Sequence, residues 1–229
     1  MNVDVHVVRV FCDEDGRFGN GLGVVFDAAG LPGEAGPALT ARLGFSETVF
    51  VDDAGRGAIR IFNPRAEMRM AGHPTVGVAW LVGEVTGAVP RVLRPRLAGE
   101  METWREGATT WVRGSLADAP EWGFVQVGSP AEVEALPVPP GPEYRHHQFW
   151  AWLDEAAGVM RTRAFAAEVG VAEDEATGSA AMRQAVRHGR PLTVRQGRGS
   201  VIAARPAPEA GRADVGGRVV LDGVRSVAL

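Results

Sequence analysis

The sequence predicts an α+β fold built mostly from antiparallel sheets, and three observations support this fold class. Short alternating or β-branched runs recur between glycine, proline and asparagine turns, whereas helical periodicity is confined to a few segments. Residues 71–80 and 174–181, about 100 positions apart, both pass from a loop into a helix of small residues, which indicates a duplicated architecture with facing halves. The 229 residues are enough for one large domain or two small ones.

The N-terminal half is expected to supply many strands and two helices. Residues 3–11 alternate and are β-branched, and residues 19–26 lead from a glycine and asparagine turn into a second strand. Residues 31–43 look helical, with apolar positions at Leu39 and Leu43. A second helix is expected from Pro74 to about residue 85. The remaining strands are expected at 48–51, 58–63, 67–70, 92–97, 101–105 and 109–113.

The C-terminal half begins after a segment rich in proline and alanine, residues 116–141, in which we expect a domain boundary. The predicted lobes are residues 1–117 and 118–229, with the last strand packing against either lobe. A short helix is expected at 131–136 and a longer one from Thr177 onward. The expected strands are 147–153, 159–165, 192–197, 201–204 and 218–221.

Composition excludes several classes of function. All 24 basic residues are arginine, so the chain has no lysine for a pyridoxal phosphate Schiff base or for a P-loop. The single cysteine, Cys12, excludes an internal disulfide and any mechanism with two facing thiols in one chain. A net charge of −4 and no apolar run of spanning length argue against nucleic-acid and membrane partners. With no signal peptide visible, a cytoplasmic location is expected.

The stretch 174–181 has the character of an anion-binding helix start. Thr177 or Ser179 can cap the first turn, and Gly178 leaves the backbone open to a ligand. The first amides of a helix have no intrahelical partner and carry the positive end of the dipole, which suits a carboxylate or phosphate. Residues 71–80 repeat this design, with Pro74 in the first helical turn. An ordinary helix start remains the alternative for either stretch.

Two further side chains are candidates for acid–base chemistry. Glu47 stands where a loop enters a strand among apolar residues, so it is either a solvated strand-end carboxylate or a partly buried one with a raised pKa. His73 directly precedes the first small-residue helix, where it either caps or fills the core, or holds a ligand carboxylate and relays a proton.

Five motifs together resemble the PhzF-like family of phenazine biosynthesis, which shares its fold with diaminopimelate epimerase. They occur in the family's order and span most of the chain: Gly19-Asn20, Ser46-Glu47-Thr48, Gly72-His73-Pro74-Thr75, residues 173–180 and Gln196-Gly197. The resemblance implies two pseudo-symmetric lobes, each a curved, mostly antiparallel sheet around a central helix. The active site is expected in the cleft between the lobes.

The resemblance also implies roles for individual residues. The expected catalytic residues are Glu47, His73 and Asp174. The expected substrate-binding residues are Asn20, Gly72, Thr75, Gly178 and Ser179. No metal or other cofactor is expected, the substrate is expected to be a small anion, and family analogy makes a homodimer plausible.

The implied activity is that of a cofactor-independent isomerase that moves a proton within a small carboxylate-bearing metabolite. A racemase or epimerase of an amino-acid-like compound is one alternative, and a non-catalytic binding protein is another. Two departures from the family pattern bear on this choice. Glu175 replaces the usual proline beside Asp174, which adds negative charge near the expected site. The chain is also shorter than most members and is expected to lack strands in its second lobe.

Overall fold

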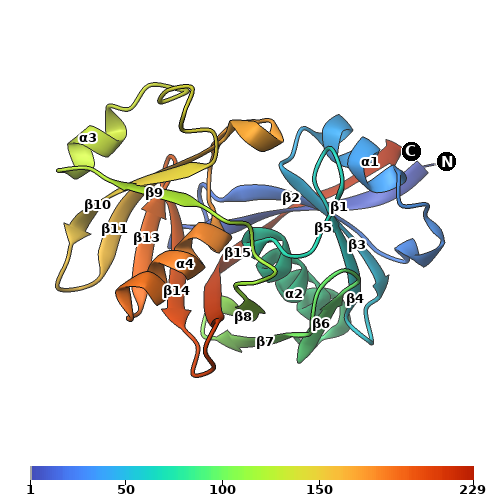
Figure 1. Ribbon diagram of the computed structural model, residues 1–229. Coiled ribbons are helices and arrows are strands. Elements are labelled where there is room, and N and C mark those ends of the chain that lie inside the picture. The colour runs from blue at the N-terminus through green and yellow to red at the C-terminus, as the bar shows by residue number, and fades with distance from the viewer. Residues whose placement is uncertain (1) are drawn as a thin grey trace.

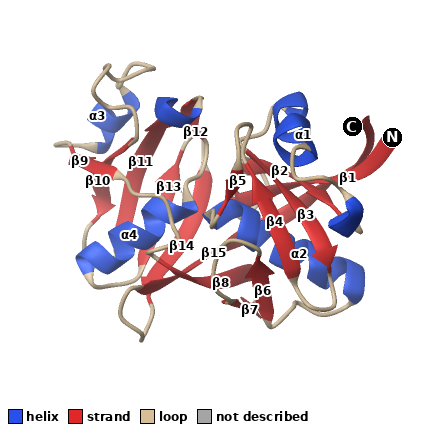
Figure 2. Cartoon of the chain, turned by 45° about the vertical axis from the view of Figure 1, so that its right-hand side comes forward, coloured by secondary structure: helices blue, strands red, loops and turns tan. Residues whose placement is uncertain are grey.

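The computed structural model describes residues 2–229 and confirms the α+β class. Two lobes of strands lie side by side, and each holds one long helix (Figure 1). The two long helices, α2 (Gly72–Thr86) and α4 (Gly178–His188), approach each other near the centre of the molecule (Figure 2). This is the expected architecture of two curved sheets, each around a central helix.

The first lobe is a closed ring of strands. Neighbouring strands in the ring are β1 (Asn2–Cys12), β2 (Asn20–Val25), β3 (Glu47–Asp53), β4 (Ala58–Phe62), β6 (Val92–Pro95), β7 (Met101–Glu106), β8 (Thr109–Ser115) and β15 (Arg212–Ala228). The ring closes because β15 also pairs with β1, in an antiparallel register that places Asn2 opposite Ala228. A two-residue strand, β5 (Glu67–Met68), is added to β4.

Helix α2 fills the ring of the first lobe. It packs against β1, β2, β3, β8 and β15, and most of its residues are buried. A helix that is apolar on nearly all sides must be enclosed, which explains its Val-, Ala- and Gly-rich sequence. The 3₁₀ turn η1 (Ala28–Gly30) and helix α1 (Ala35–Leu43) pack on the outside of β3, around a smaller core that includes Leu39 and Phe50.

The second lobe is an open sheet. Its strands run outward from β15 in the order β14 (Ser200–Pro206), β13 (Leu192–Gln196), β11 (Val159–Ala166), β10 (His147–Asp154) and β9 (Gly123–Gln126). Helix α4 packs against β13, β14 and β15. The short helix α3 (Pro130–Glu134) packs on β10 and β11, and η2 (Ala167–Val169) leads into β12 (Val171–Asp174), which pairs with β11.

Strand β15 belongs to both lobes, and its glycines make the crossing possible. Residues Arg212–Gly217 pair with β8 on one side, while Ala213–Gly216 pair with β14 on the other. A Cβ on Gly216 would lie 2.6 Å from the Trp111 ring, and one on Gly217 would lie 2.5 Å from the Phe11 ring. The sequence predicted only residues 218–221 of this strand because the paired glycines resemble a turn.

The segment between the lobes differs from its expected form. Residues 116–141 were expected to form the boundary and one short helix, and they also contain β9. This four-residue strand is too short for alternation to reveal it. The division at residues 117 and 118 stays a prediction. No helix within residues 2–229 is both long enough and apolar enough to cross a membrane.

Candidate active site

The two small-residue helix starts meet in the centre of the molecule. Gly72 and Gly178 are in backbone contact, since a Cβ on Gly72 would lie 2.6 Å from the Cα of Gly178. In each helix, the first amide that donates back to the preceding loop belongs to Thr75 or Ala181. The earlier amides of both helices therefore lack an intrahelical acceptor, and the positive ends of two helix dipoles lie close together.

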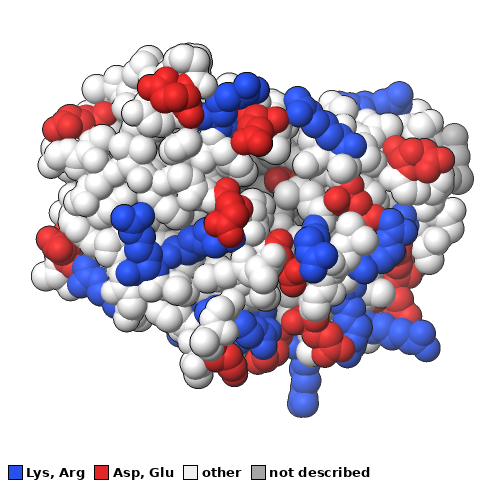
Figure 3. Space-filling model, viewed as in Figure 1, with Lys and Arg blue, Asp and Glu red and all other residues white. Residues whose placement is uncertain are grey.

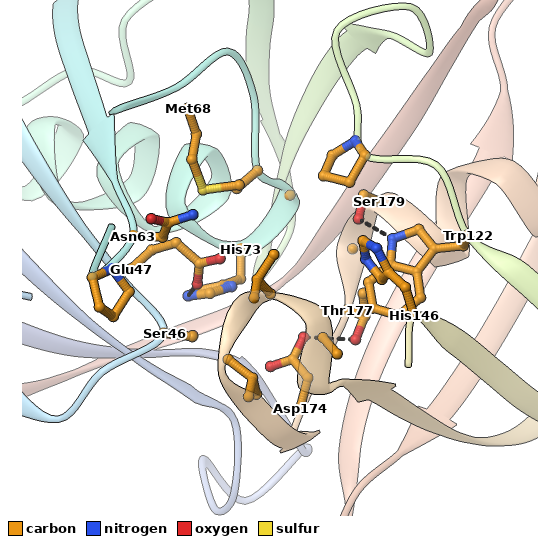
Figure 4. A pocket seen from close by; sticks show the side chains of 18 residues that line it. Ser46, Glu47, Asn63, Met68, His73, Trp122, His146, Asp174, Thr177 and Ser179 are labelled. Atoms are coloured by element: carbon orange, nitrogen blue, oxygen red, sulfur yellow. Dashed lines mark hydrogen bonds and ion pairs between the residues drawn. The ribbon is translucent and has the colours of Figure 1, made fainter. Parts of the chain in front are cut away.

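A cavity of about 110 Å³ lies beside these helix starts and is lined by both lobes (Figure 4). Acidic and basic side chains of the surrounding face are interspersed, without a large field of one sign (Figure 3). The side chains that line the cavity include two carboxylates and two histidines. They are Glu47, His73, His146 and Asp174, together with Ser46, Asn63, Met68, Trp122, Thr177 and Ser179.

Glu47 is the first residue of β3, and its side chain is 16% exposed. Its Oε2 has no hydrogen-bond partner within residues 2–229 and lies 3.4 Å from His73 Nε2, which also lacks a hydrogen-bond partner there. Burial, followed by the nearby charge of Asp174, raises the pKa of Glu47 from 4.5 to about 8. Glu47 is therefore a partly buried carboxyl that faces the cavity and is suited to proton transfer at neutral pH.

His73 is a neutral imidazole in this site. Burial lowers its pKa from 6.5 to about 3, although the side chain also hydrogen-bonds the backbone of Gly21. Its contact with Glu47 is consequently not an ion pair. The other ring nitrogen, Nδ1, lies 3.4 Å from the amide Nδ2 of Asn20, so the imidazole stands between Asn20 and Glu47.

Both carboxylate oxygens of Asp174 accept hydrogen bonds from the protein. The Asn20 amide donates to Oδ1 at 2.6 Å, and the Thr177 hydroxyl donates to Oδ2 at 2.6 Å. Gln196 Nε2 donates to Thr177 Oγ1 at 2.7 Å, which leaves the Thr177 hydrogen for Asp174. Burial raises the pKa of Asp174 to about 6, and these hydrogen bonds oppose the rise.

Two of the predicted substrate-binding residues lie outside the cavity lining. The Asn20 amide is used on Asp174 and on the carbonyl of Ala176, so Asn20 from the first lobe holds a carboxylate of the second. Thr75 is fully buried and donates its hydroxyl to the carbonyls of Ala71 and Gly72. Direct substrate contact by these two side chains stays a prediction, and both hydrogen-bond other groups of the protein.

Six of the eight expected site residues line the cavity: Glu47, Gly72, His73, Asp174, Gly178 and Ser179. Their roles toward a substrate stay predictions. The structure brings them together because the two helix starts abut and because β3 begins beside them.

Glu175 was expected to add negative charge beside Asp174, and its side chain does not itself line the cavity. Its carboxylate accepts from the Ser200 hydroxyl at 2.8 Å and from the amide and guanidinium of Arg198 at 3.1 and 3.2 Å. Its charge is thus paired on the turn between β13 and β14. It still contributes to the raised pKa of Asp174, after burial and the local hydrogen bonds.

Trp122 and His146 line the cavity and were not predicted from the sequence. The Trp122 indole Nε1 donates to Ser179 Oγ at 3.0 Å. The Trp122 and His146 rings pack edge to face, with their centroids 4.1 Å apart. The only available signal was an isolated tryptophan within the proline- and alanine-rich segment 116–141.

Comparison with known proteins gives consistent results along most of the chain. The family model for phenazine biosynthesis-like proteins, PhzC-PhzF, matches residues 8–135. Over 73 residues the chain is 45% identical to an uncharacterized isomerase of Mesorhizobium japonicum. This alignment covers 30% of this chain and 24% of that protein. It is 29% identical over 264 positions to the trans-2,3-dihydro-3-hydroxyanthranilate isomerase of Pseudomonas aeruginosa, covering 93% of this chain and 91% of that protein.

A solved structure supports the same fold. The PhzC/PhzF phenazine biosynthesis protein from Clostridium difficile superposes with a TM-score of 0.77 at 18% identity, over 99% of this chain and 100% of that one. The alignment with the Pseudomonas aeruginosa isomerase is longer than the 229 residues of this chain, so that relative carries residues that are missing here. This agrees with the expected shortening.

Proposed function

This chain belongs to the phenazine biosynthesis-like (PhzC-PhzF) family, and from that premise we propose that it moves a proton between two carbons of a small unsaturated carboxylate without a cofactor. The chain is an isomerase, as its curated relatives are named. The observation that carries the proposal is the geometry of Glu47, an unpartnered carboxyl that faces two amide-rich helix starts across one small cavity.

In the proposed reaction, the ionised Glu47 takes a proton from a carbon made acidic by a neighbouring unsaturated or carboxyl group. The electron pair of the broken C–H bond spreads into the conjugated system, and Glu47 returns its proton to a different carbon of the same molecule. Substrate and product are isomers, and the enzyme ends in its starting state. The helix starts at Gly72 and Gly178 stabilise the negative charge that develops on the substrate.

His73 and Asp174 support this step in different ways. The neutral imidazole of His73 lies against Glu47 and keeps its carboxyl oriented toward the cavity. Together with burial, the charge of Asp174 raises the pKa of Glu47 to about 8. A carboxyl with a pKa near neutral pH can both remove a proton from the substrate and return it.

The one-base isomerase is favoured over a racemase or epimerase by the state of Asp174. Inverting a stereocentre needs a second acid–base group on the opposite face of the substrate. Asp174 is the other carboxylate of the cavity within residues 2–229, and both of its oxygens already accept hydrogen bonds. A binding protein without catalysis is disfavoured by Glu47, whose buried Oε2 has no hydrogen-bond partner within residues 2–229 and whose pKa is raised to about 8.

Solvent deuterium incorporation tests this function. The first substrate to try is trans-2,3-dihydro-3-hydroxyanthranilate, because the Pseudomonas aeruginosa relative is named for it. Wild-type protein in D₂O is expected to place deuterium on a substrate carbon, and Glu47→Gln is expected to abolish exchange while ligand binding stays measurable. Exchange that persists in Glu47→Gln would show that Glu47 is not the base. A cytoplasmic location and a homodimer stay predictions.

A further inference from the structure

Trp122 and His146 form an aromatic wall on the second-lobe side of the cavity. Strands β9 and β10 are parallel, with Gly123 opposite His147, so the residues that precede them are brought side by side. Their rings pack edge to face at 72°, and both line the cavity (Figure 4). Burial lowers the pKa of His146, against the charge of Glu168, so this ring is uncharged at neutral pH.

The hydrogen bond from Trp122 fixes the direction of the Ser179 hydroxyl. An indole N–H can only donate, so Ser179 Oγ accepts in this pair, at 3.0 Å. The Ser179 hydroxyl then has one hydrogen left, and it donates in no hydrogen bond found within residues 2–229. A ligand oxygen in the cavity is its natural acceptor.

The Ser179 donor matters more because the cavity lining offers no cationic side chain among the described residues. No arginine lines the cavity among the described residues, and the chain has no lysine. His73 stays neutral because burial lowers its pKa to about 3. Negative charge on a ligand must therefore be met by neutral donors, which are the free helix amides and the Ser179 hydroxyl.

The size of the cavity suits a single small ring. Its volume is about 110 Å³. An engineered protein cavity of roughly 150 Å³ binds benzene, so this smaller cavity has room for at most one six-membered ring. The Trp122 and His146 rings stand at 72° to each other, so an unsaturated ring in this space can pack face or edge against an aromatic side chain.

We propose that Trp122 determines specificity in this enzyme. Its indole N–H positions the Ser179 hydroxyl as a donor to a substrate oxygen, and its ring, supported by His146, selects an unsaturated ring over a saturated one. This inference rests on the proposed function, because it concerns the same site and names the substrate class as an unsaturated cyclic carboxylate.

Binding measurements on the full chain test the wall without relying on turnover. Calorimetry compares 2-aminobenzoate, a planar ring carboxylate, with cyclohexanecarboxylate, a saturated ring of similar size. Wild-type protein is expected to prefer the planar ligand. Trp122→Leu is expected to reduce that preference by about 3- to 10-fold, the usual value of an aromatic pair. An unchanged preference overturns the role of the wall.

A double-mutant cycle tests the positioning of Ser179. Trp122→Phe keeps an aromatic ring and removes the N–H donor. This variant is expected to weaken binding of both ligands by about 3- to 10-fold, a typical hydrogen-bond contribution. Ser179→Ala is expected to weaken binding at least as much, and adding Trp122→Phe to it is expected to change nothing further. Additive losses would show that Trp122 does not act through Ser179.

Two further measurements keep the result interpretable. Trp152→Phe is the matched control, because Trp152 also lies on the second lobe, next to Trp150 and His188, and does not line the cavity. It is expected to leave both affinities unchanged.

In wild-type protein, 2-aminobenzoate is expected to change tryptophan fluorescence. The absence of a change would overturn the role of the aromatic wall even if a Trp122 variant fails to fold. Binding without deuterium exchange would instead refute the isomerase and leave the wall intact.

Discussion

Gly72 and Gly178 touch backbone to backbone where the two central helices begin, and neither position has room for a methyl group. A Cβ on Gly72 would meet Gly178 Cα at 2.6 Å, and a Cβ on Gly178 would meet Gly72 Cα at 2.9 Å. The contact holds the free amides of both helices at one cavity, so the glycines set the spacing on which anion stabilisation depends.

Gly178→Ala is expected to push the helix starts apart. Overpacking of this kind typically costs about 1–3 kcal/mol of stability, and the displaced amides should lower kcat/KM more than tenfold. Thermal unfolding and deuterium exchange measure the two effects. Gly33→Ala is the control, since a Cβ there meets nothing within 4 Å and is expected to change neither quantity. Full activity in Gly178→Ala would contradict the importance of the contact.

The pH dependence of stability is expected to depend on Glu47. Its folded-state pKa of about 8 lies above the ordinary 4.5, so the native state holds this proton more tightly than the unfolded state. The stabilisation is present below about pH 4.5 and is lost as pH rises through about 8, by at most about 1.4 kcal/mol per pH unit. Glu47→Gln cannot ionise, so its melting temperature should rise relative to wild type between pH 5 and 9. A constant difference between the two proteins would show that the pKa of Glu47 is not raised.

The rate of isomerisation is expected to rise with pH through about 8. Only the ionised Glu47 can remove a proton, and with a pKa of about 8 roughly one site in ten is ionised at pH 7. The profile of kcat/KM should therefore fall about tenfold per pH unit on the acid side of pH 8. A profile that is flat between pH 6 and 9 would argue against Glu47 as the base in the free enzyme.

Thr177→Val is expected to raise the pKa of Asp174, seen by NMR as a shift of its carboxyl titration to higher pH. The Thr177 hydroxyl donates to Asp174 Oδ2, and loss of this bond removes one of the interactions that lower the pKa of Asp174. Thr40→Val is the matched control, because the Thr40 hydroxyl donates to the Gly36 carbonyl within α1, away from the cavity. It is expected to keep the wild-type titration of Asp174, and equal shifts in both variants would contradict the role of Thr177.

Local sequence chemistry was sufficient to predict the helix starts and to identify Glu47 and His73 as candidates for acid–base chemistry. Bare glycine and alanine turns at the head of an apolar run indicate exposed amides wherever they occur. Family resemblance then implied that the two starts face one cavity. Nothing local to Asn20 shows that its amide reaches Asp174 in the other lobe, 154 residues away along the chain.

The aromatic wall was not predictable for a related reason. Trp122 and His146 become neighbours through the parallel register of β9 and β10, and β9 is only four residues long. Parallel pairing between strands joined by a long connection leaves no periodic signal in a single sequence. The charge of Glu175 beside Asp174 was predictable, whereas its partners Arg198 and Ser200 were not, because they lie on a turn more than twenty residues further along the chain.

The ring of strands around α2 is completed by β15, which follows all the other strands of both lobes along the chain. Until Arg212–Ala228 has emerged, β1 and β8 each lack a neighbour and the apolar surface of α2 has no complete cover. The lobe that is translated first therefore finishes folding last, after the second lobe already has most of its strands. Newly made chains should depend on protection from aggregation during this interval, and a truncation before Arg212 should be insoluble even though it keeps Glu47, His73 and Asp174.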